Sequence, residues 1–548
     1  MMNPIPVLLR SLCAAIILIA FTTVTSAGPR GAEKATEHSN KPFNREAALQ
    51  QREEVHKWLL SETVTRGLGS PIVATFSDEE KSSVDNAPPG GAPKRVGLTR
   101  SLSVDVSFAD LKKSRVRKGS LTRPHGAISP TADGGYVYSA MISSPGATGV
   151  RIHFKGFQLP ESTGLYLYNE TGQVFGPYTG SGPQGDGEFW SHTVTGDYAL
   201  VQLRHLGGVT DDDLRNTAFR VAGVAHIRRE FLEGFCSINH ECVVNADCVK
   251  PNPADPARKA VALMQWVSGA WVYICSGGLI ADMDESTDIP YFLTANHCIG
   301  RSNDARTLEA FFQLTADCRN PDCDGRLNDH PAELRTLGAT IKDTGKQTDH
   351  TLMRLNEAAP EDSSFLGWDS TPIEFAAGTP LYRISHPSGA PQAYSEHEVE
   401  TKRQACAGWP RGKYIYSRDL FGTTEGGSSG SPLLNAEGQV VGQLTGGCGG
   451  GGDGGYCGYL NYSTVDGAFA RYYDDVREFL DPQGGSCTPV TEICVDGVDN
   501  DCDGLIDAAD PDCPTPSCNL KKKGDQCSAD SDCCSNKCTG RPGAQVCR

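Results

Sequence analysis

The chain has 548 residues, of which 38% are hydrophobic and 8% aromatic, and its formal net charge at pH 7 is -17. This length allows several domains, and the 61 glycines suit a β-rich, turn-rich fold. The acidic balance argues against a nucleic-acid partner, because phosphate groups would meet no basic patch.

Residues 1–27 are typical of a secretory signal peptide. Arg10 supplies the positive start, CAAIILIAF forms a short apolar core, and small residues lead up to Ala27. This apolar run is too short to span a membrane comfortably, and no later segment is apolar enough to do so. The sequence therefore predicts a secreted protein without a membrane span.

Residues 28–94 are predicted to form a polar segment and a linker. The stretch EAALQQREEVHKWLLSE, which begins at Glu46, has helical spacing, and a linker rich in proline and glycine follows it. Over residues 95–225, short apolar strands alternate with turns, which predicts a β-sandwich. This region holds no cysteine and no cluster of catalytic groups, so we interpret it as a pro-domain; a carbohydrate-binding module is the alternative.

Residues 230–486 form a second β-rich region. Its apolar strands include AWVYICSGGLI, YFLTANHCIG, HTLMRL, TPLYRISH and QVVGQL, and no helices alternate with them. Many short strands in this arrangement predict antiparallel barrels. RYYDDVREFL, which begins at Arg471, is predicted to be a closing helix.

The cysteines divide into even groups. Of the 21 cysteines, Cys13 lies in the signal peptide, ten lie between Cys236 and Cys457, and the last ten lie beyond residue 486, as groups of four and six. Even groups indicate separately oxidised domains in an oxidising compartment. Segments 487–513 and 514–548 are too short for hydrophobic cores, so each needs disulfides or a metal to hold a fold.

The heptapeptide GGSSGSP, residues 426–432, predicts a tight turn that presents Ser429. A serine hydroxyl becomes a good nucleophile when a base takes its proton and backbone donors hold the oxyanion. Glycines beside the serine allow the sharp turn that aims N–H groups at that oxyanion. A flexible linker is the alternative, but the stretch runs into LLNAEGQVVGQL, two apolar runs around a turn, which indicates a folded β domain.

A base and an acid for this serine are predicted at His297 and Asp349. His297 follows an apolar strand and precedes Cys298, whose natural disulfide partner is Cys275 in ICSGGLI. Asp349, in TDHTLMRL, precedes a buried strand, from which a carboxylate can orient an imidazole and stabilise its protonated form. The order His, Asp, Ser is that of chymotrypsin-type enzymes.

Residues 230–480 resemble the chymotrypsin-fold serine endopeptidases, and among them the secreted bacterial lysyl-endopeptidase-like group. CSGGLI, LTANHC, DHTLMRL, ISHPSG, EGGSSGSPLLN and GQLTGG carry the resemblance. It implies that His297 is the general base, Asp349 its orienting acid and Ser429 the nucleophile, with an oxyanion hole made by the N–H groups of Gly427 and Ser429. Residues 95–225 look like the β-rich pro-region that precedes such proteases.

Two departures from the chymotrypsin pattern bear on activation and specificity. Many of these zymogens pair a newly freed terminal amine with an Asp just before the nucleophile. In this chain the residue before the nucleophile is Ser428, so we expect activation by removal of the pro-region instead. Arg228 and Arg229 are the predicted cleavage site. Trypsin-like enzymes carry an Asp six residues before the nucleophile, where this chain has Thr423.

The resemblance moves the acid of the specificity pocket to a later loop. The lysyl-specific group takes this acid from the loop after the GQLxGG strand, and here that loop, GGCGGGGDGGYCGYL, contains Asp453 as its only carboxylate. We therefore predict a substrate-binding set of Asp453, Thr423 and Thr445 and a preference for Lys or Arg at P1. A solvated turn residue is the alternative for Asp453, and a structural role is favoured for His386 over one in the cleft.

Residues 487–513 contain an acidic loop. Its aspartates and one glycine fall at positions 1, 3, 5, 6, 9 and 12 of a calcium loop: Asp499, Asp501, Asp503, Gly504, Asp507 and Asp510. Position 12 is Asp where an EF-hand has Glu, and no flanking helices are evident. We predict a disulfide-supported Ca²⁺ loop similar to the DxDxDG repeats of secreted proteins, with a solvated acidic turn as the alternative.

The last module resembles inhibitor-cystine-knot miniproteins. The adjacent residues Cys533 and Cys534 are flanked by single cysteines. The resemblance implies the disulfides Cys518–Cys534, Cys527–Cys538 and Cys533–Cys547, although other connectivities stay open. The module is predicted to be either a protease-resistant cap or a contact with a surface or receptor.

The sequence thus predicts a mainly β protein: a β-sandwich-like pro-region, a double antiparallel β-barrel protease domain and small disulfide-rich modules. The predicted function is a secreted serine endopeptidase that acts on polypeptides and needs no cofactor for catalysis. Two alternatives are a catalytically silent binding protein on a protease scaffold and a toxin-like or adhesive protein that acts through its tail.

Overall fold

The computed structural model describes residues 33–63, 69–85, 93–228, 241–284, 286–318, 330–449, 462–481, 538–539 and 546–547. The signal peptide, Asp453, the predicted calcium loop and most of the cystine-knot-like module lie outside these residues. Within the last module, β31 (Cys538–Thr539) pairs with β32 (Val546–Cys547). In the described part of the chain, no helix is long and apolar enough to cross a membrane.

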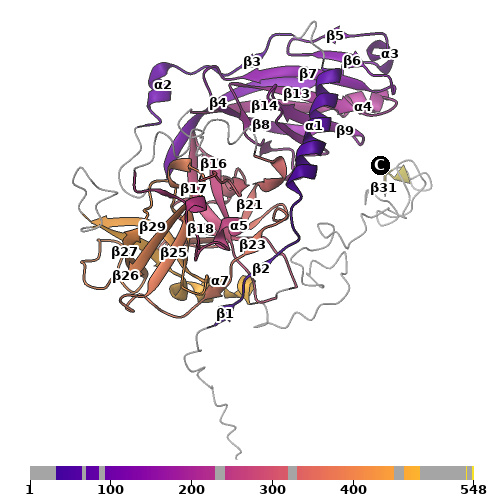
Figure 1. Ribbon diagram of the computed structural model, residues 1–548. Helices are drawn as coiled ribbons and strands as arrows, with labels where there is room; N and C mark the ends of the chain where they lie inside the picture. Colours follow the sequence, from indigo (N-terminus) through magenta and orange to yellow (C-terminus); the bar gives the residue numbers. More distant parts are fainter. Residues whose placement is uncertain are drawn as a thin grey trace, which may run out of the picture.

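A β-sandwich forms the N-terminal part of the molecule, at the top of Figure 1. One sheet has the order β10-β9-β13-β7-β6-β5, with β3 beside β7. Its strands are β3 (Ile72–Val73), β5 (Leu121–Thr122), β6 (Ala127–Pro130), β7 (Tyr136–Ser143), β9 (Thr163–Tyr168), β10 (Val174–Tyr178) and β13 (Tyr198–His205). The facing strands are β4 (Lys94–Ser107), β8 (Gly149–Gln158), β11 (Phe189–Trp190), β12 (Val194–Thr195) and β14 (Ala218–Ile227).

The core of the sandwich follows from the period-two alternation of its strands. Tyr138 and Leu203 from one sheet and Ile152 and Val221 from the other belong to one buried cluster, because alternate side chains of a strand point to the same face. Helix α1 (Arg45–Glu62) has nearly the same bounds as the helix predicted from Glu46. It packs Leu59 on the outer face of the first sheet. The other helices of this part are α2 (Asp78–Ser82), α3 (Lys113–Val116) and α4 (Asp211–Arg215).

The first barrel of the following region is a curled antiparallel sheet with the order β20-β19-β16-β17-β18-β22-β21. Its strands are β16 (Val261–Ser268), β17 (Trp271–Leu279), β18 (Tyr291–Ala295), β19 (Glu309–Phe312), β20 (Arg335–Leu337), β21 (Ala339–Gly345) and β22 (His350–Leu355). Only Gly338 separates β20 from β21, so one chain segment pairs with β19 at its start and with β22 afterwards. The sheet therefore returns to its first strands.

The second barrel is a closed ring of strands. The pairs β25–β26, β26–β27, β27–β30, β30–β29, β29–β28 and β28–β25 are all antiparallel. The strands are β25 (Pro380–Ser385), β26 (Ala393–Val399), β27 (Tyr414–Phe421), β28 (Pro432–Leu434), β29 (Val440–Gly449) and β30 (Tyr462–Ala468). The predicted mainly β fold is confirmed.

Short helices connect these strands, and one helix closes the region. Helix α7 (Tyr473–Leu480), after a 3₁₀ turn at Phe469–Arg471, buries Val476 and Leu480 in the cluster that also contains residues of the first barrel. The remaining short helices are α5 (Ala257–Ala260), α6 (Ser302–Ala305) and the 3₁₀ turns Ala246–Cys248, Ala332–Leu334 and Pro387–Gly389.

The sandwich and the first barrel share a sheet, which the sequence did not indicate. Strand β4 pairs with β14 on one side and, from Lys94 to Leu98, with β17 of the barrel on the other. The N-terminal segment also adds two strands to the second region: β1 (Lys34–Ala35) pairs with β24 (Trp368–Asp369), and β2 (His38–Ser39) pairs with β23 (Ser364–Phe365). Within the second region, β15 (Val244–Asn245) pairs with β26.

A buried ion cluster also joins the sandwich to the first barrel. Glu309 of β19 lies between Arg335 of the barrel and Arg151 of the sandwich, at 3.4 and 3.5 Å, and all three side chains are fully buried. Its carboxylate also accepts hydrogen bonds from the backbone N–H and the hydroxyl of Thr193, at 2.9 and 2.6 Å. A carboxylate in this position neutralises cations that the interior would otherwise disfavour.

Replacing Glu309 with leucine is expected to lower the free energy of unfolding by about 3–5 kcal/mol, because two buried guanidinium groups lose their counter-ion. Urea unfolding of the full chain measures this change. The matched control is Glu361→Gln, which breaks the exposed pair with Lys41 and should change the free energy of unfolding far less, because water screens exposed charges. Equal effects of the two substitutions would contradict a stabilising role of the cluster.

Candidate active site

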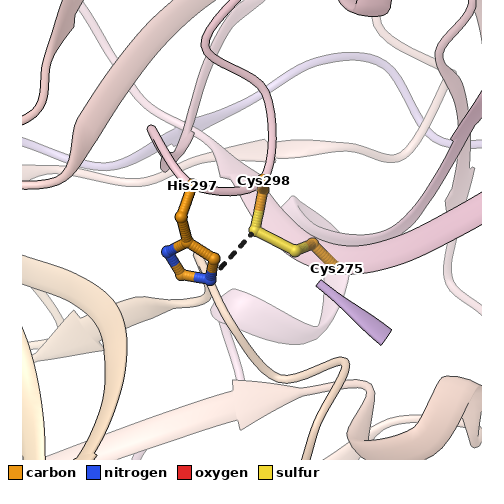
Figure 2. Close-up of side chains that lie close together, drawn as sticks. All are labelled: Cys275, His297 and Cys298. Carbon is orange, nitrogen blue, oxygen red and sulfur yellow. Dashed lines mark hydrogen bonds between the residues drawn. A yellow bond between two sulfur atoms is a disulfide. The ribbon is translucent and has the colours of Figure 1, made fainter. Parts of the chain in front are cut away.

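His297 lies in a turn that a disulfide holds against the first barrel. Strand β18 ends at Ala295, and Cys298, the residue after His297, is bonded to Cys275 of β17 with a Cα–Cα distance of 6.2 Å. Figure 2 shows the imidazole beside this bond. The disulfide fixes the turn that carries the histidine to a central strand, as expected from the sequence.

The same group has the spacing of a metal site but not its chemistry. One ligand atom from each of Cys275, His297 and Cys298 lies within 4.8 Å of the others. Both sulfur atoms are consumed in the disulfide, whereas metal binding by cysteine requires thiolates. We therefore interpret this group as a structural support for the histidine.

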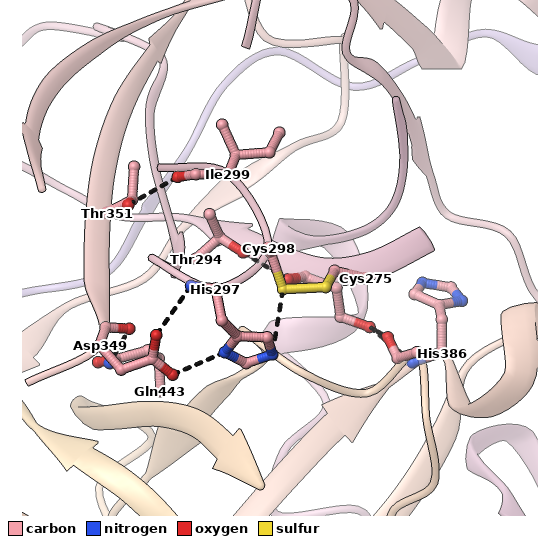
Figure 3. The surroundings of a disulfide bond; sticks show 11 residues. Cys275, Thr294, His297, Cys298, Ile299, Asp349, Thr351, His386 and Gln443 are labelled. Atoms are coloured by element: carbon pink, nitrogen blue, oxygen red, sulfur yellow. Dashed lines mark hydrogen bonds and ion pairs between the residues drawn. A yellow bond between two sulfur atoms is a disulfide. The ribbon is translucent and has the colours of Figure 1, made fainter. Parts of the chain in front are cut away.

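Asp349 accepts two hydrogen bonds from His297. The Nδ1 atom of the ring lies 2.7 Å from Oδ2, and the backbone N–H of His297 donates to Oδ1 at 2.8 Å. Figure 3 shows both contacts. A carboxylate bound in this way fixes the ring orientation and leaves Nε2 as the proton acceptor. Both side chains are largely buried, with exposed fractions of 19% for His297 and 9% for Asp349.

The loop that carries Ser429 is tied to the strand that carries Cys275. Ser276 donates its backbone N–H to the carbonyl of Ser429 at 2.8 Å and its hydroxyl to the carbonyl of Gly427 at 2.9 Å. At Gly430 a Cβ atom would lie 2.2 Å from Oγ1 of Thr294, so only glycine allows the loop to approach the end of β18 this closely. The disulfide and Ser276 thus bring the serine loop to the histidine turn.

Two backbone N–H groups in this loop are available to a ligand. Among the described residues, neither the N–H of Gly427 nor that of Ser429 donates to a protein acceptor. Across the same residues, no hydrogen bond joins Ser429 Oγ to His297, whose Nε2 atom has Cys298 Sγ at 3.7 Å. Hydrogen bonds between a nucleophile and its base are often long without substrate and tighten when substrate binds.

Ser428, where many chymotrypsin-like enzymes carry an aspartate, is fully buried. Its hydroxyl accepts a hydrogen bond from Ser385 at 3.1 Å and lies 3.3 Å from the backbone N–H of Glu425. The hydroxyl of Ser428 thus makes neutral contacts at the position where those enzymes have a carboxylate.

Three of the remaining predicted residues are buried in the structure. Thr423 is buried and donates its hydroxyl to Asp419 at 2.9 Å. Thr445 is also buried, and its hydroxyl has no partner in the described part of the chain. His386 is fully buried with Nδ1 at 2.8 Å from the carbonyl of Ala390, and burial lowers its pKa to about 4, which suits a neutral structural histidine. Asp453 lies outside the described residues.

The sequence did not assign roles to two residues that hold this site. Ser276, in ICSGGLI, ties the serine loop to β17, and Gln443, in the GQL segment, contacts the backbone of Asp349 at 3.0 Å. Both lie inside the motifs that carry the resemblance, but nothing in their spacing indicates what their side chains contact.

Replacing Asp349 with asparagine is expected to reduce kcat for peptide hydrolysis about 10⁴-fold, because the amide leaves the imidazole in the wrong tautomer. Steady-state kinetics measures the loss. Asp343→Asn is a matched control, because Asp343 also bonds a histidine, His350, at 2.7 Å on the neighbouring strands. A loss of similar size in the control, or none in Asp349→Asn, would contradict the assignment.

Comparison with known proteins gives consistent matches. Residues 236–456 match the family model described as the C-terminal domain of lysyl endopeptidase. The chain is 28% identical over 370 residues to a lysyl endopeptidase of Pseudomonas aeruginosa. The aligned region covers 63% of this chain and 76% of that protein.

Two of the solved structures that the chain resembles are proteases. The HtrA-type protease AlgW with a tripeptide is 15% identical, with a TM-score of 0.30 over 42% of this chain and 64% of that chain, less than two thirds of its length. The active form of the Rv3671c protease from M. tuberculosis is 13% identical, with a TM-score of 0.29 over 46% of this chain and 94% of that chain. Together with the two barrels, the family match shows that residues 236–456 form a protease domain of the lysyl-endopeptidase-like group.

Proposed function

We propose that this protein is a secreted serine endopeptidase with a His297–Asp349–Ser429 triad. The observation that carries the proposal is the pair of hydrogen bonds from His297 to Asp349, at 2.7 and 2.8 Å, next to a serine loop tied to the same disulfide-bonded strand. This arrangement provides an oriented base and a presented hydroxyl, as acyl transfer requires.

In the proposed reaction, Ser429 Oγ attacks the carbonyl carbon of the scissile bond while His297 Nε2 takes the hydroxyl proton. The N–H groups of Gly427 and Ser429 stabilise the oxyanion. The C–N bond then breaks, and His297 returns the proton to the leaving amine. Water attacks the resulting acyl-enzyme, with His297 again acting as base, and releases the carboxylic product and free Ser429.

The proposed precursor is a zymogen that its pro-region keeps inactive. Strand β4 pairs with β17 up to Ile274, the residue before Cys275, and Lys94 donates a hydrogen bond to Ser388 at 2.8 Å. The backbone N–H of Ser388 in turn donates to the carbonyl of Gly426 in the serine loop. The pro-region therefore lies against the segment that braces this loop, and we propose that cleavage near Arg228 and Arg229 begins its removal.

The proposed substrates are polypeptides with Lys or Arg at P1. The lysyl endopeptidase of Pseudomonas aeruginosa bears a preference for lysine in its name, and Asp453 is the only carboxylate in the loop 446–460. A carboxylate there would pair with a cationic P1 side chain.

Peptide substrates that differ only in Lys, Arg, Phe or Ala at P1 test this proposal. We expect the processed wild type to cleave the Lys and Arg peptides fastest, Ser429→Ala to cleave none, and Asp453→Ala to lose about 10²-fold on the cationic substrates, because their charge is left unpaired. An unchanged preference in Asp453→Ala would remove this residue from the pocket. Equal cleavage by wild type and Ser429→Ala would contradict the serine mechanism.

We further propose that residues 499–510 bind Ca²⁺ and that the cystine-knot-like module contacts a surface or receptor. The calcium proposal depends on five carboxylates in calcium-loop register. Isothermal titration of the full chain should detect binding that Asp501→Asn together with Asp503→Asn weakens at least tenfold, because two oxygen ligands lose their charge. Absence of binding at millimolar Ca²⁺ would end this proposal.

A further inference from the structure

Asp349 has a backbone conformation that needs external support. It lies between β21 and β22 with φ of +54°, in the left-handed region that a non-glycine residue occupies at a cost. Its carboxylate must nevertheless meet both N–H groups of His297. Such a conformation persists only where the surroundings determine it.

Gln443 supplies much of this support from the second barrel. Its Nε2 atom donates to the carbonyl of Thr348 and to that of Asp349, each at 3.0 Å, as the position of Gln443 below Asp349 in Figure 3 illustrates. The backbone N–H of Asn296 donates to the same carbonyl of Asp349 at 2.9 Å. The turn that carries the acid is thus held from both barrels.

Tyr472 binds the other end of the Gln443 amide. The two carbonyls can only accept, so they require the Nε2 side of the amide, and the tyrosine hydroxyl donates to Oε1 at 2.5 Å. Both side chains are fully buried. The ring of Tyr472 in turn stacks on His350, next to Asp349, with centroids 4.0 Å apart. An amide flip would break the two hydrogen bonds to the carbonyls, because Oε1 cannot donate to them.

Gly467 leaves the room that this contact requires. A Cβ atom at this position would lie 2.1 Å from the carbonyl oxygen of Thr348 and 2.2 Å from Nε2 of Gln443. Any larger residue on β30 would therefore displace the amide or the turn.

The residue after Gln443 holds the nucleophile. The carbonyl of Leu444 accepts from the N–H of Gly430 at 2.8 Å, and its N–H donates to the carbonyl of Ser431 at 3.0 Å. Two consecutive residues of β29 thus bind the acid turn of the first barrel and the serine loop of the second. Their separation along one strand fixes the distance between these parts.

We propose that Gln443 is a positioning residue of the triad, which holds Asp349 in register with His297 and, through its neighbour Leu444, with Ser429. The expected effect of Gln443 on kcat rests on the proposed function. Its expected effect on the hydrogen bond between His297 and Asp349 does not depend on activity. Gln443 touches no substrate in this account and acts through Asp349.

Gln443→Met removes the amide and keeps the size of the side chain. A matched control is Gln392→Met, because Gln392 is equally buried and its Nε2 atom also donates to two carbonyls, those of Arg258 and Val261, at 2.7 and 3.3 Å. Tyr472→Phe is a milder variant, which keeps the stacked ring and loses only the hydroxyl.

The first readout is the low-field proton resonance of the hydrogen bond between His297 Nδ1 and Asp349, recorded on the full chain. We expect it in the wild type and in Gln392→Met, and we expect it to shift or disappear in Gln443→Met. The second is kinetic: kcat should fall about 10²-fold in Gln443→Met, as for a misplaced catalytic group, and about fivefold in Tyr472→Phe. KM should change little in both variants.

An unchanged resonance and an unchanged kcat in folded Gln443→Met would overturn the proposal, as would an equal loss in Gln392→Met. If Gln443→Met does not fold, Tyr472→Phe decides by the same two readouts. A processed wild type that hydrolyses no peptide, although the full chain shows the resonance, would refute the proposed function, while loss of that resonance in Gln443→Met would still support the positioning role.

Discussion

The site depends on one carboxylate, that of Asp349, which must accept two hydrogen bonds from His297 at once. Both bonds form only if the β21–β22 turn adopts its strained conformation and the histidine turn lies beside it. The disulfide between Cys275 and Cys298 fixes the histidine, and Gln443 and Asn296 fix the acid. Since Gln443 belongs to the second barrel, the geometry of the pair depends on how the two barrels dock.

This constraint explains why β17 and β29 carry so many of the contacts. Strand β17 provides Cys275 for the histidine turn and Ser276 for the serine loop. Strand β29 provides Gln443 for the acid and the backbone of Leu444 for the same loop. Each strand therefore links two parts of the site, and the proposed nucleophile is positioned by contacts from both barrels.

The N-terminal sandwich, which is the proposed pro-region, is integrated into the fold more closely than a separate domain would be. Strand β4 continues the sheet of the sandwich into the first barrel, and Glu309 neutralises an arginine from each part. Short strands from residues 34–39 are added to the opposite side of the protease region. Removal of the pro-region would expose an edge of β17 and leave Glu309 paired with Arg335 alone.

The sequence predicted those features that local patterns encode. Alternating apolar strands indicated the mainly β fold, GGSSGSP indicated a presented serine, and the cysteine beside His297 indicated the disulfide with Cys275. Contacts between distant segments were not predictable in the same way. The β4–β17 pairing, the amide of Gln443 on Asp349 and the space left by Gly467 depend on which strands meet, and periodicity does not report this. The acid of the specificity pocket also remains a prediction, because Asp453 lies outside the described residues.

The central claim is that Ser429 is a nucleophile activated by His297. A fluorophosphonate probe tests it most directly, because such probes react with activated serines and leave a covalent adduct that peptide mapping by mass spectrometry can locate. We expect a single adduct on Ser429 in the processed wild type and none in Ser429→Ala. Absence of an adduct in correctly processed protein, or an adduct on a different serine, would contradict the account.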